Sequence, residues 1–177
     1  MAKIDNLTEI VAGCKKGDSE CFSQLVDAYS GRFYGYFYRL TGNRDISDDL
    51  LSELFVKLVV KIGSFKGEAF ETWLFRVATN IFHDYLRKKQ RQGKLLDARK
   101  DDLQEQAEQK RHSEDVRIDD LQRQLGNLDE DTRQLIMLRF YSQLSFKELA
   151  KMRGEPIGTT LAKVHRGLKK LRELMEQ

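Results

Sequence analysis

The chain has 177 residues, of which 40% are hydrophobic and 33% are charged, and its formal net charge is +3. A single proline and few runs of β-branched residues favour helices over strands, so we expect an all-α protein. The sequence has no run of about eighteen apolar residues and no signal-peptide pattern at its start. We therefore expect a cytoplasmic protein without direct membrane insertion.

Charge is distributed unevenly along the chain. Residues 1–92 carry 14 basic and 12 acidic side chains, residues 93–127 carry 7 and 9, and residues 128–177 carry 10 and 7. A polyanion responds to local patches of charge, so the two basic outer blocks are more informative than the net charge.

The first candidate site along the chain is a pair of cysteines, Cys14 and Cys21. They form no C-x-x-C motif and no histidines are paired with them. Two free thiols in a reducing compartment are therefore favoured over a disulfide or a metal site. We expect neither a metal nor a cofactor.

The segment 45–62 predicts an amphipathic helix with an acidic start. Its apolar stripe consists of Leu50, Leu51, Leu54, Phe55, Leu58, Val59 and Ile62. Its acidic cluster consists of Asp45, Asp48, Asp49 and Glu53. Taken alone, this cluster fits a solvated helix start, stabilised by the helix dipole, as well as it fits a functional site.

After the break "GSFKGEAF", residues 71–91 predict a second helix that becomes basic toward its end. Its aromatic residues are Trp73, Phe75, Phe82 and Tyr85, and its polar and basic residues include Arg76, Asn80, Arg87, Lys88, Lys89 and Arg91. Aromatic faces beside cations suit unstacked bases and a track of phosphates. Core packing is the alternative for Trp73, Val77, Ile81 and Phe82, and it is the expected role of most of them.

Residues 93–120 are rich in charge and glutamine and contain no aromatic residue. Such a segment buries little apolar surface, so we expect a linker that is extended or transiently helical. Helical periodicity returns around Leu121, Leu125 and Leu128. The chain therefore divides into a helical domain over 1–92, the linker, and a second helical domain over 121–177.

The second domain has the pattern of a helix-turn-helix with a supporting helix, "LDEDTRQLIMLRFY". Ser145 and Glu148 form a capping box, Gly154 suits a helix end, and Pro156 suits the first turn of the last helix. The apolar stripe of the last helix is Ile157, Leu161, Val164, Leu168, Leu171 and Met175. Basic residues fall on its other faces, which favours DNA binding over an ordinary helical hairpin with a solvated basic face.

Four segments in order resemble the extracytoplasmic-function (ECF) type of bacterial RNA polymerase sigma factor, in the sigma-70 family. "KKGDSECFSQLVDAY" is similar to the opening segment of that family, and "DISDDLLSELFVKL" to its acidic segment. "FETWLFRVATNIFHDYLRK" is close to T-W-L-y-R-I-A-x-N-x-x-x-D-x-x-R. "LDEDTRQLIMLRFYSQLSFKELA" with "GTT" follows the C-terminal pattern. The resemblance covers nearly the whole chain.

The resemblance implies an alternative sigma factor, which is not an enzyme. Such a protein binds core RNA polymerase, directs it to promoters through the −35 and −10 elements, and promotes DNA opening. The first domain, a sigma region 2-like bundle, would bind the clamp helices of the β′ subunit. The implied polymerase contacts are Asp45, Asp48, Asp49, Leu50, Glu53 and Leu54.

The same domain would open the −10 element, with the loop Gly63–Phe70 capturing a base flipped from the non-template strand. Flipping a base costs a few kcal/mol, so a pocket with the right shape is needed to offset it. The implied −10 contacts are Ser64, Phe65, Lys66, Gly67, Trp73, Arg76, Asn80, Arg87, Lys88 and Lys89.

The second domain, similar to sigma region 4, would read the −35 element in the major groove and contact the β flap, while the linker threads toward the active centre. The implied −35 contacts are Pro156, Gly158, Thr159, Thr160, Leu161, Lys163, Arg166 and Lys170. An anti-sigma factor is an expected partner. We expect the two domains to fold onto each other in the isolated protein, or to be held in that arrangement by the anti-sigma factor, and so to hide DNA-binding surface.

The chain departs from the family pattern at several positions, among them three around the start of the last helix. Thr160 stands where an apolar residue is usual, Leu161 stands where Lys is common, and "MRGEP" adds Arg153 before the turn. We expect either a small rotation of the recognition helix or a contact between Leu161 and a thymine methyl group.

Two other classes fit parts of the sequence. A helix-turn-helix transcription regulator that is not a polymerase subunit would bind a specific duplex without core polymerase. An enzyme would use Asp49, Glu53, His83 and Asp84 as a metal or acid–base site, but no known catalytic motif accompanies them, and adjacent residues point to different sides of a helix. His112 and His165 are expected to be surface residues.

Overall fold

The structure of the chain is a computed structural model that describes residues 6–67, 69–99 and 120–176. Within these ranges the chain forms eight α-helices, one short 3-10 helix and no strand, which confirms the prediction of an all-α fold. The elements are α1 (Leu7–Lys15), α2 (Ser19–Thr41), α3 (Arg44–Lys61), η1 (Ile62–Ser64), α4 (Phe70–Arg99), α5 (Asp120–Gly126), α6 (Glu130–Ser142), α7 (Phe146–Arg153) and α8 (Ile157–Met175). Among the helices so described, none has the length and apolar character needed to cross a membrane.

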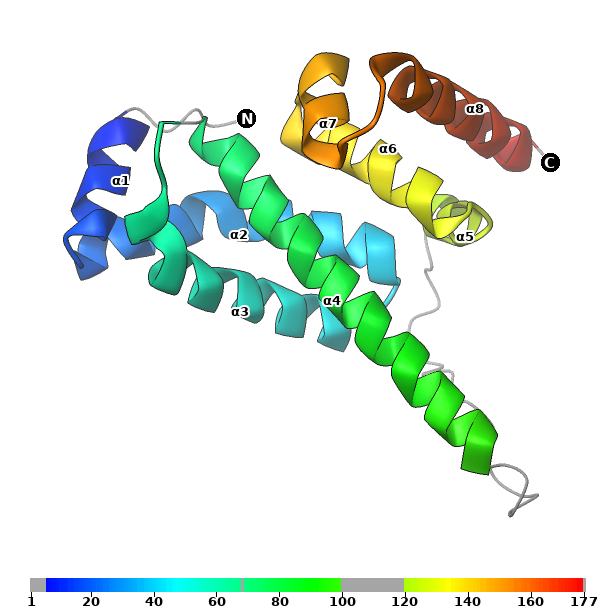
Figure 1. Cartoon of the computed structure of the whole chain (residues 1–177), viewed down its shortest axis with the longest axis horizontal. Helices are drawn as coiled ribbons and strands as arrows, with labels where there is room; N and C mark the ends of the chain where they lie inside the picture. Colours follow the sequence, from blue (N-terminus) through cyan, green and yellow to red (C-terminus); the bar gives the residue numbers. More distant parts are fainter. Residues whose placement is uncertain (1–5, 68, 100–119, 177) are drawn as a thin grey trace.

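The helices form two units that lie side by side (Figure 1). The first unit is α1–α4 and the second is α5–α8. The last turns of α4 project away from the first unit. Helix α4 continues to Arg99, into the segment predicted as a linker. Most of that segment, including His112, lies outside the described residues, so the predicted domain boundaries stay a prediction.

The first unit is built around aromatic side chains at helical spacing on α2. Tyr29, Phe33 and Tyr36 recur every three or four residues, so they share one face of the helix and are all buried. The ring of Phe75, from α4, lies against them: its centroid is 4.5 Å from that of Phe33 and 5.7 Å from that of Tyr36. Burying one such side chain contributes about 1.5–3 kcal/mol. This aromatic core fixes α4 across the bundle.

The elbow between α1 and α2 contains the two cysteines. Asp18 is the N-cap of α2 and accepts hydrogen bonds from the backbone N–H groups of Glu20 and Cys21. Both cysteines are free thiols; Cys14 is buried and Cys21 is half-buried. Burial raises the pKa of Cys14 to about 11, so its thiol stays protonated at neutral pH.

The apolar stripe of α3 is narrower than predicted. Leu50, Leu54 and Leu58 are buried, but Val59, a member of the predicted apolar stripe, is exposed. The reason is that α3 packs against α2 and α4 on one side only, which leaves its outer side to solvent.

The second unit confirms the predicted helix boundaries around the turn. The Ser145 hydroxyl accepts from the Glu148 N–H, and the Glu148 carboxylate accepts from the Ser145 N–H, which is the reciprocal capping box. Gly154 ends α7 with φ +67°, a left-handed conformation that favours glycine. Pro156 is the N-cap of α8.

The rotation of α8 differs from the sequence prediction. Its buried face is Thr160, Val164, Gly167 and Leu171. Four members of the predicted stripe are exposed instead: Ile157, Leu161, Leu168 and Met175. The reason is a close approach of α6, because a Cβ at Gly167 would lie only 2.8 Å from Ile136 Cδ1. Because of this approach, the face of α8 that contains Gly167 points toward α6, and Leu161 and Leu168 lie at the side of the helix, exposed to solvent.

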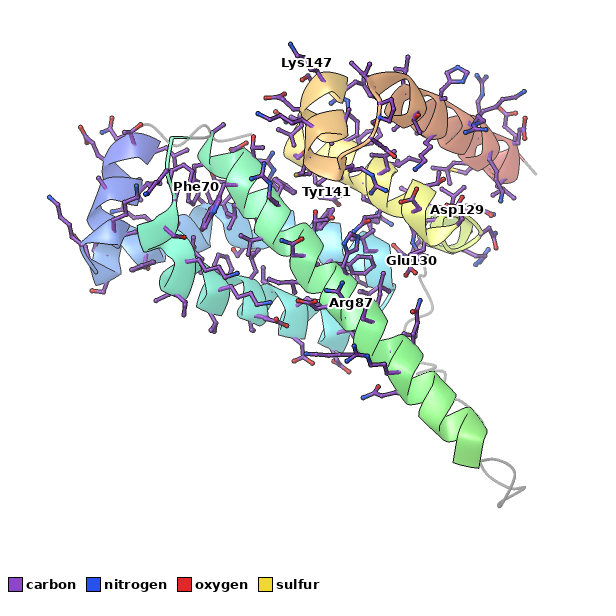
Figure 2. The ribbon with its side chains drawn as sticks, viewed as in Figure 1. Phe70, Arg87, Asp129, Glu130, Tyr141 and Lys147 are labelled. Carbon is purple, nitrogen blue, oxygen red and sulfur yellow. The ribbon has the colours of Figure 1, made fainter. Side chains whose placement is uncertain are left out.

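The two units pack through Tyr141 of α6. Its ring meets that of Tyr36 at 71°, with centroids 6.0 Å apart, and it covers Gly35, where a Cβ would come within 2.9 Å of the phenol oxygen. Arg32 donates from Nε to the Tyr141 carbonyl at 2.6 Å. Figure 2 shows Tyr141 on the side of α6 that faces the first unit.

This packing confirms that the two domains fold onto each other, but it does not hide the recognition helix. Helix α6 lies between α8 and the first unit (Figure 1), and Thr159, Arg166 and Lys170 of α8 are exposed. The expected masking of this DNA-binding surface was therefore wrong for the described arrangement.

Candidate nucleic-acid and polymerase interfaces

The acidic start of α3 lies on the side of the helix that faces away from the bundle. Asp45, Asp48 and Asp49 are exposed, whereas Leu50 and Leu54 are buried behind them. The predicted polymerase contacts are thus divided. A partner can reach the acids, but the two leucines support the helix from within.

Three valines that sequence reasoning missed extend this surface. Val56, Val59 and Val60 are exposed, and Val60 is 76% exposed. Glu53 lies at the edge of the surface, with Oε1 2.7 Å from Lys57 Nζ. We define the outer face of α3 as Asp45, Asp48, Asp49, Val56, Val59 and Val60. It offers acids at one end and apolar area at the other, a combination that marks interaction surfaces.

The loop 63–67, which covers the end of η1 and the start of its connection to α4, is anchored by Phe65. This ring is buried, and its centroid lies 5.6 Å from that of Phe70 and 5.4 Å from that of Trp73. Lys15 of α1 donates from Nζ to the Phe65 carbonyl at 2.8 Å and lies over the ring. Three predicted −10 contacts are exposed on the loop: Ser64, Lys66 and Gly67.

A polar pocket of about 300 Å³ lies between α3 and α4. Its lining residues are Lys57, Lys61, Val77, Asn80, His83, Asp84 and Arg87. Asn80 is exposed at this pocket, so its amide can donate to and accept from a bound group. Three cations and one carboxylate give the pocket a net positive lining, which favours an anionic ligand.

Within this pocket, Asp84 is held by its neighbours. Arg87 donates a hydrogen bond to the Asp84 carboxylate, and Lys57 Nζ lies 3.8 Å from it. The hydrogen bond from Arg87 lowers the pKa of Asp84 below its ordinary value. Figure 2 shows Arg87 where α4 leaves the bundle, and Lys88 and Lys89 follow it as exposed cations.

The remaining predicted −10 contacts lie deeper. Trp73 and Arg76 are half-buried, and Val77, Ile81 and Phe82 are buried in the core as expected. Trp73 belongs to the aromatic cluster with Phe65, so packing accounts for part of its surface.

Helix α8 presents an exposed face opposite its buried one. We define the outward face of α8 as Gly158, Thr159, Ala162, His165, Arg166 and Lys169, all exposed. Sequence reasoning found Gly158, Thr159 and Arg166, but it missed Ala162 and Lys169 and treated His165 only as a surface residue. Because Gly167 lies on the buried face of α8, residues half a turn away from it lie on the outward face, and counting from Gly167 would have found these residues.

The other predicted −35 contacts divide into exposed and engaged side chains. Pro156 and Leu161 are exposed, and Leu161 lies on the apolar flank. Lys170 donates to the Asn127 carbonyl at 3.1 Å. Thr160 is fully buried, so no DNA base can reach it in this arrangement.

Thr160 and Lys163 belong to a polar cluster beside the turn between α7 and α8. The Thr160 hydroxyl donates to Glu155 Oε1 at 2.9 Å. Lys163 Nζ donates to Glu155 Oε2 and to Asp131 Oδ2, both at 2.9 Å. Arg153 pairs with the same two carboxylates. We call Asp131, Arg153, Glu155, Thr160 and Lys163 the turn network.

The four candidate enzyme residues do not converge on one site, although His83 and Asp84 both line the pocket between α3 and α4. Asp49 lies on the outer face of α3, whereas His83 Nε2 lies 2.9 Å from Gln134 Oε1 of α6, and Asp84 pairs with Arg87. Across the described ranges, no group of three or more His, Cys, Asp or Glu side chains is placed to hold a metal ion.

Comparison with known proteins identifies both helical units. Residues 25–92 match the family model Sigma-70 region 2, and residues 125–173 match Sigma-70, region 4. The chain is 30% identical over 171 residues to the ECF RNA polymerase sigma factor SigW of Bacillus subtilis (strain 168), covering 90% of this chain and 91% of SigW. The chain belongs to the ECF family of RNA polymerase sigma factors.

Other relatives support the same assignment for this sigma factor. It is 31% identical over 179 residues to the ECF RNA polymerase sigma-E factor of Haemophilus influenzae, covering 94% of this chain and 92% of the relative. These relatives are sigma factors, which are regulatory subunits rather than enzymes. The protein is accordingly an alternative sigma factor that directs RNA polymerase to promoters.

Solved structures of sigma factors share its fold. The sigma factor RpoE, in complex with the anti-sigma factor NepR from Bartonella quintana, aligns with a TM-score of 0.69 and 26% identity, over 88% of this chain and 96% of RpoE. CnrH, in complex with the cytosolic domain of CnrY, aligns with a TM-score of 0.68 and 23% identity, over 94% of this chain and 95% of CnrH.

One residue that supports the loop 63–67 lies outside the matched regions. Helix α1 precedes residue 25, where the region 2 match begins, yet its Lys15 holds the loop that joins η1 to α4. No sequence pattern points from Lys15 to that loop, because fifty residues separate Lys15 from Phe65.

Proposed function

We propose that this sigma factor binds the β′ clamp through the outer face of α3, opens the −10 element at the pocket beside Asn80, and reads the −35 element with the outward face of α8. The observation that carries the proposal is the separation of these surfaces. Two exposed basic surfaces lie on different helical units, and the acidic surface lies on α3 alone.

The polymerase contact is supported by the chemistry of the outer face of α3. Exposed carboxylates at the start of a helix suit arginines on a partner, and charge complementarity speeds encounter and fixes orientation. The valines supply apolar area that gains free energy when a partner covers it. The predicted contacts Leu50 and Leu54 act from the core, by holding α3 in place.

DNA opening is supported by the neighbourhood of Asn80. A flipped base needs a site that offsets a few kcal/mol of lost stacking and pairing. The pocket offers an exposed amide for the base edge and cations for the phosphates beside it. Stacking on an aromatic face is worth about 1–3 kcal/mol per base, and Trp73 is a half-buried aromatic residue of α4.

An anti-sigma factor is a further proposed partner, by similarity to RpoE in complex with NepR. An apolar groove of about 360 Å³ runs between α2 and the second unit. Its lining residues are Arg39, Leu121, Ile136, Met137, Phe140, Tyr141, Leu168 and Leu171. Phe140 is 65% exposed, so an apolar helix of the partner would gain by covering it. We place these interactions in the cytoplasm, where the polymerase and the DNA are.

The deciding experiment is in vitro transcription with bacterial core polymerase on a library of promoters. We expect transcription only when the sigma factor is added, from templates that share a −35 and a −10 sequence. Core binding is measured in parallel by titration. The double variant Asp48→Arg/Asp49→Arg should lose affinity for core polymerase, whereas the control Asp27→Arg, on exposed α2 surface, should keep it.

Two outcomes would contradict the proposal. Duplex binding without any affinity for core polymerase would favour the alternative of a helix-turn-helix regulator. Unchanged core affinity of Asp48→Arg/Asp49→Arg would remove the outer face of α3 as the polymerase contact.

A further inference from the structure

Two of the residues in which this chain departs from the family pattern lie on either side of the turn between α7 and α8. Thr160 stands at a usually apolar position, and Arg153 is added before the turn. Glu155 connects the two, because it accepts from the Thr160 hydroxyl and pairs with the Arg153 guanidinium. The departures are therefore linked, and together they replace an apolar contact with a polar one.

We propose that the turn network sets the rotation of α8 about its axis, and that Lys163 is a positioning residue rather than a DNA contact. The proposal rests on the function proposed above for α8, the reading of the −35 element. It changes the assignment of Lys163, which the family resemblance places among the bases and phosphates.

The burial of Thr160 makes the network necessary. A fully buried hydroxyl without a hydrogen bond is destabilising, and Glu155 is the side chain that accepts from it. Glu155 is itself half-buried, so its negative charge needs a partner in turn. Lys163 and Arg153 supply two positive charges against the two carboxylates of Asp131 and Glu155, which leaves the cluster neutral.

The pKa values of three residues of the turn network are shifted by this arrangement. Burial alone would raise the pKa of Asp131, but the hydrogen bond from Lys163 and the charge of Arg153 hold it below its ordinary value. The same opposition lowers the pKa of Glu155. The hydrogen bonds to Asp131 and Glu155 raise the pKa of Lys163. Each group is thus stabilised in its charged form by the others.

Lys163 forms its ion pairs on the side of α8 that faces α6 and the turn. Its ammonium donates to both carboxylates at 2.9 Å, and only 27% of its side chain is exposed. To reach a phosphate it would have to leave two charged hydrogen bonds, and the two carboxylates would keep only Arg153 as a cationic partner in the network. Lys169, by contrast, lies on the outward face with 71% of its side chain exposed.

Helix α8 is held at two positions along its length. Near the middle of α8, Gly167 lies against Ile136 of α6, and near its start Thr160 is tied to Glu155. These positions are seven residues apart, two turns of the same face. A helix that is held at both points is fixed in its rotation about its own axis. In this rotation His165, Arg166 and Lys169 face outward.

The test combines protein stability with DNA binding. Urea unfolding of the full chain is measured for Lys163→Met, for Glu155→Gln and for the double variant. A network predicts that Lys163→Met lowers the unfolding midpoint and that the loss is smaller when Glu155 is already Gln, because the partner charge is gone. Thr160→Val, which removes only the hydroxyl, should relieve part of the cost of Glu155→Gln.

The second arm measures affinity of the holoenzyme for promoter DNA across a series of salt concentrations. Lys169→Met should reduce the slope of log affinity against log salt by about 0.9, the value for one phosphate contact, whereas Lys163→Met should leave the slope unchanged. Additive stability changes, or a slope change in Lys163→Met equal to that of Lys169→Met, would overturn the proposal. A wild-type holoenzyme indifferent to the −35 sequence would instead refute the function proposed for α8, while the unfolding arm would still decide on the network.

Discussion

The two DNA-facing surfaces are supported in different ways. The −10 surface rests on the aromatic core of the first unit, in which Phe75 of α4 packs against Phe33 and Tyr36 of α2. The −35 surface rests on α8, which buries Val164 and Leu171 and is also held by the polar turn network and by the close approach at Gly167. Apolar packing is insensitive to pH and salt, whereas ion pairs respond to both. The two surfaces should therefore fail under different perturbations.

The largest effect is expected from the aromatic core. Phe75→Ala should lower the free energy of unfolding by about 3–5 kcal/mol, because the ring is fully buried and its removal leaves a cavity. Urea unfolding followed by fluorescence of Trp73, the single tryptophan, measures the loss in the first unit. Phe140→Ala, which truncates an exposed ring, is the control and should stay within about 0.5 kcal/mol. Equal losses would mean that Phe75 is not in the core.

The next effect is expected where α8 meets α6. Gly167→Ala should cost about 1–3 kcal/mol through overpacking against Thr132 and Ile136, in spite of the better helix propensity of alanine. Holoenzyme binding to the −35 element should weaken as α8 moves, while opening of the −10 element is retained. Gly31→Ala, on an open part of α2, is the matched control and should be neutral or stabilising. A stabilised Gly167→Ala would contradict the close approach.

A smaller effect is expected at the pocket beside Asn80. Asn80→Ala should weaken strand opening by about 1 kcal/mol, roughly fivefold, because one hydrogen bond to the flipped base is lost. Permanganate reactivity of thymines in the −10 element measures opening. Gln90→Ala, an exposed residue farther along α4, serves as control. Normal thymine reactivity in Asn80→Ala, with holoenzyme bound, would remove Asn80 from this role.

The smallest effect is a difference in pH dependence between the units. Asp131 and Glu155 have lowered pKa values in the folded protein, so their stabilisation is present above the pKa of the unfolded chain and is lost as pH falls. Below about pH 4 the second unit should therefore weaken before the aromatic core. Circular dichroism, which reports both units, should begin to change at a higher pH than Trp73 fluorescence. Coincident transitions would argue against the difference.

Much of this architecture could be predicted from the sequence. The capping box of Ser145 and Glu148 and the glycine at position 154 fixed the turn before α8, because these signals act over three or four residues. Asp45, Asp48 and Asp49 of α3 and Asn80 of α4 were found exposed, whereas Glu53 of the predicted acidic cluster is half-buried. Local chemistry sufficed wherever the determining contacts lie within one helix.

The rest depends on contacts between distant residues. The rotation of α8 was misjudged because Leu161 and Leu168 are more apolar than Thr160 and Gly167, and only the approach of α6 reveals which face is inside. The ion pairs of Lys163 could not be predicted for the same reason, since its partners Asp131 and Glu155 lie outside α8. The support of the loop by Lys15 likewise appears only in three dimensions.

The seating of Tyr141 over Gly35 has a consequence for how the protein behaves at different copy numbers. Both halves of this contact belong to one chain, so its opening and closing form a first-order equilibrium. The closed fraction is then the same in a cell that holds few copies and in one that holds many. Competition for core polymerase depends on concentration, but the resting conformation that enters this competition does not.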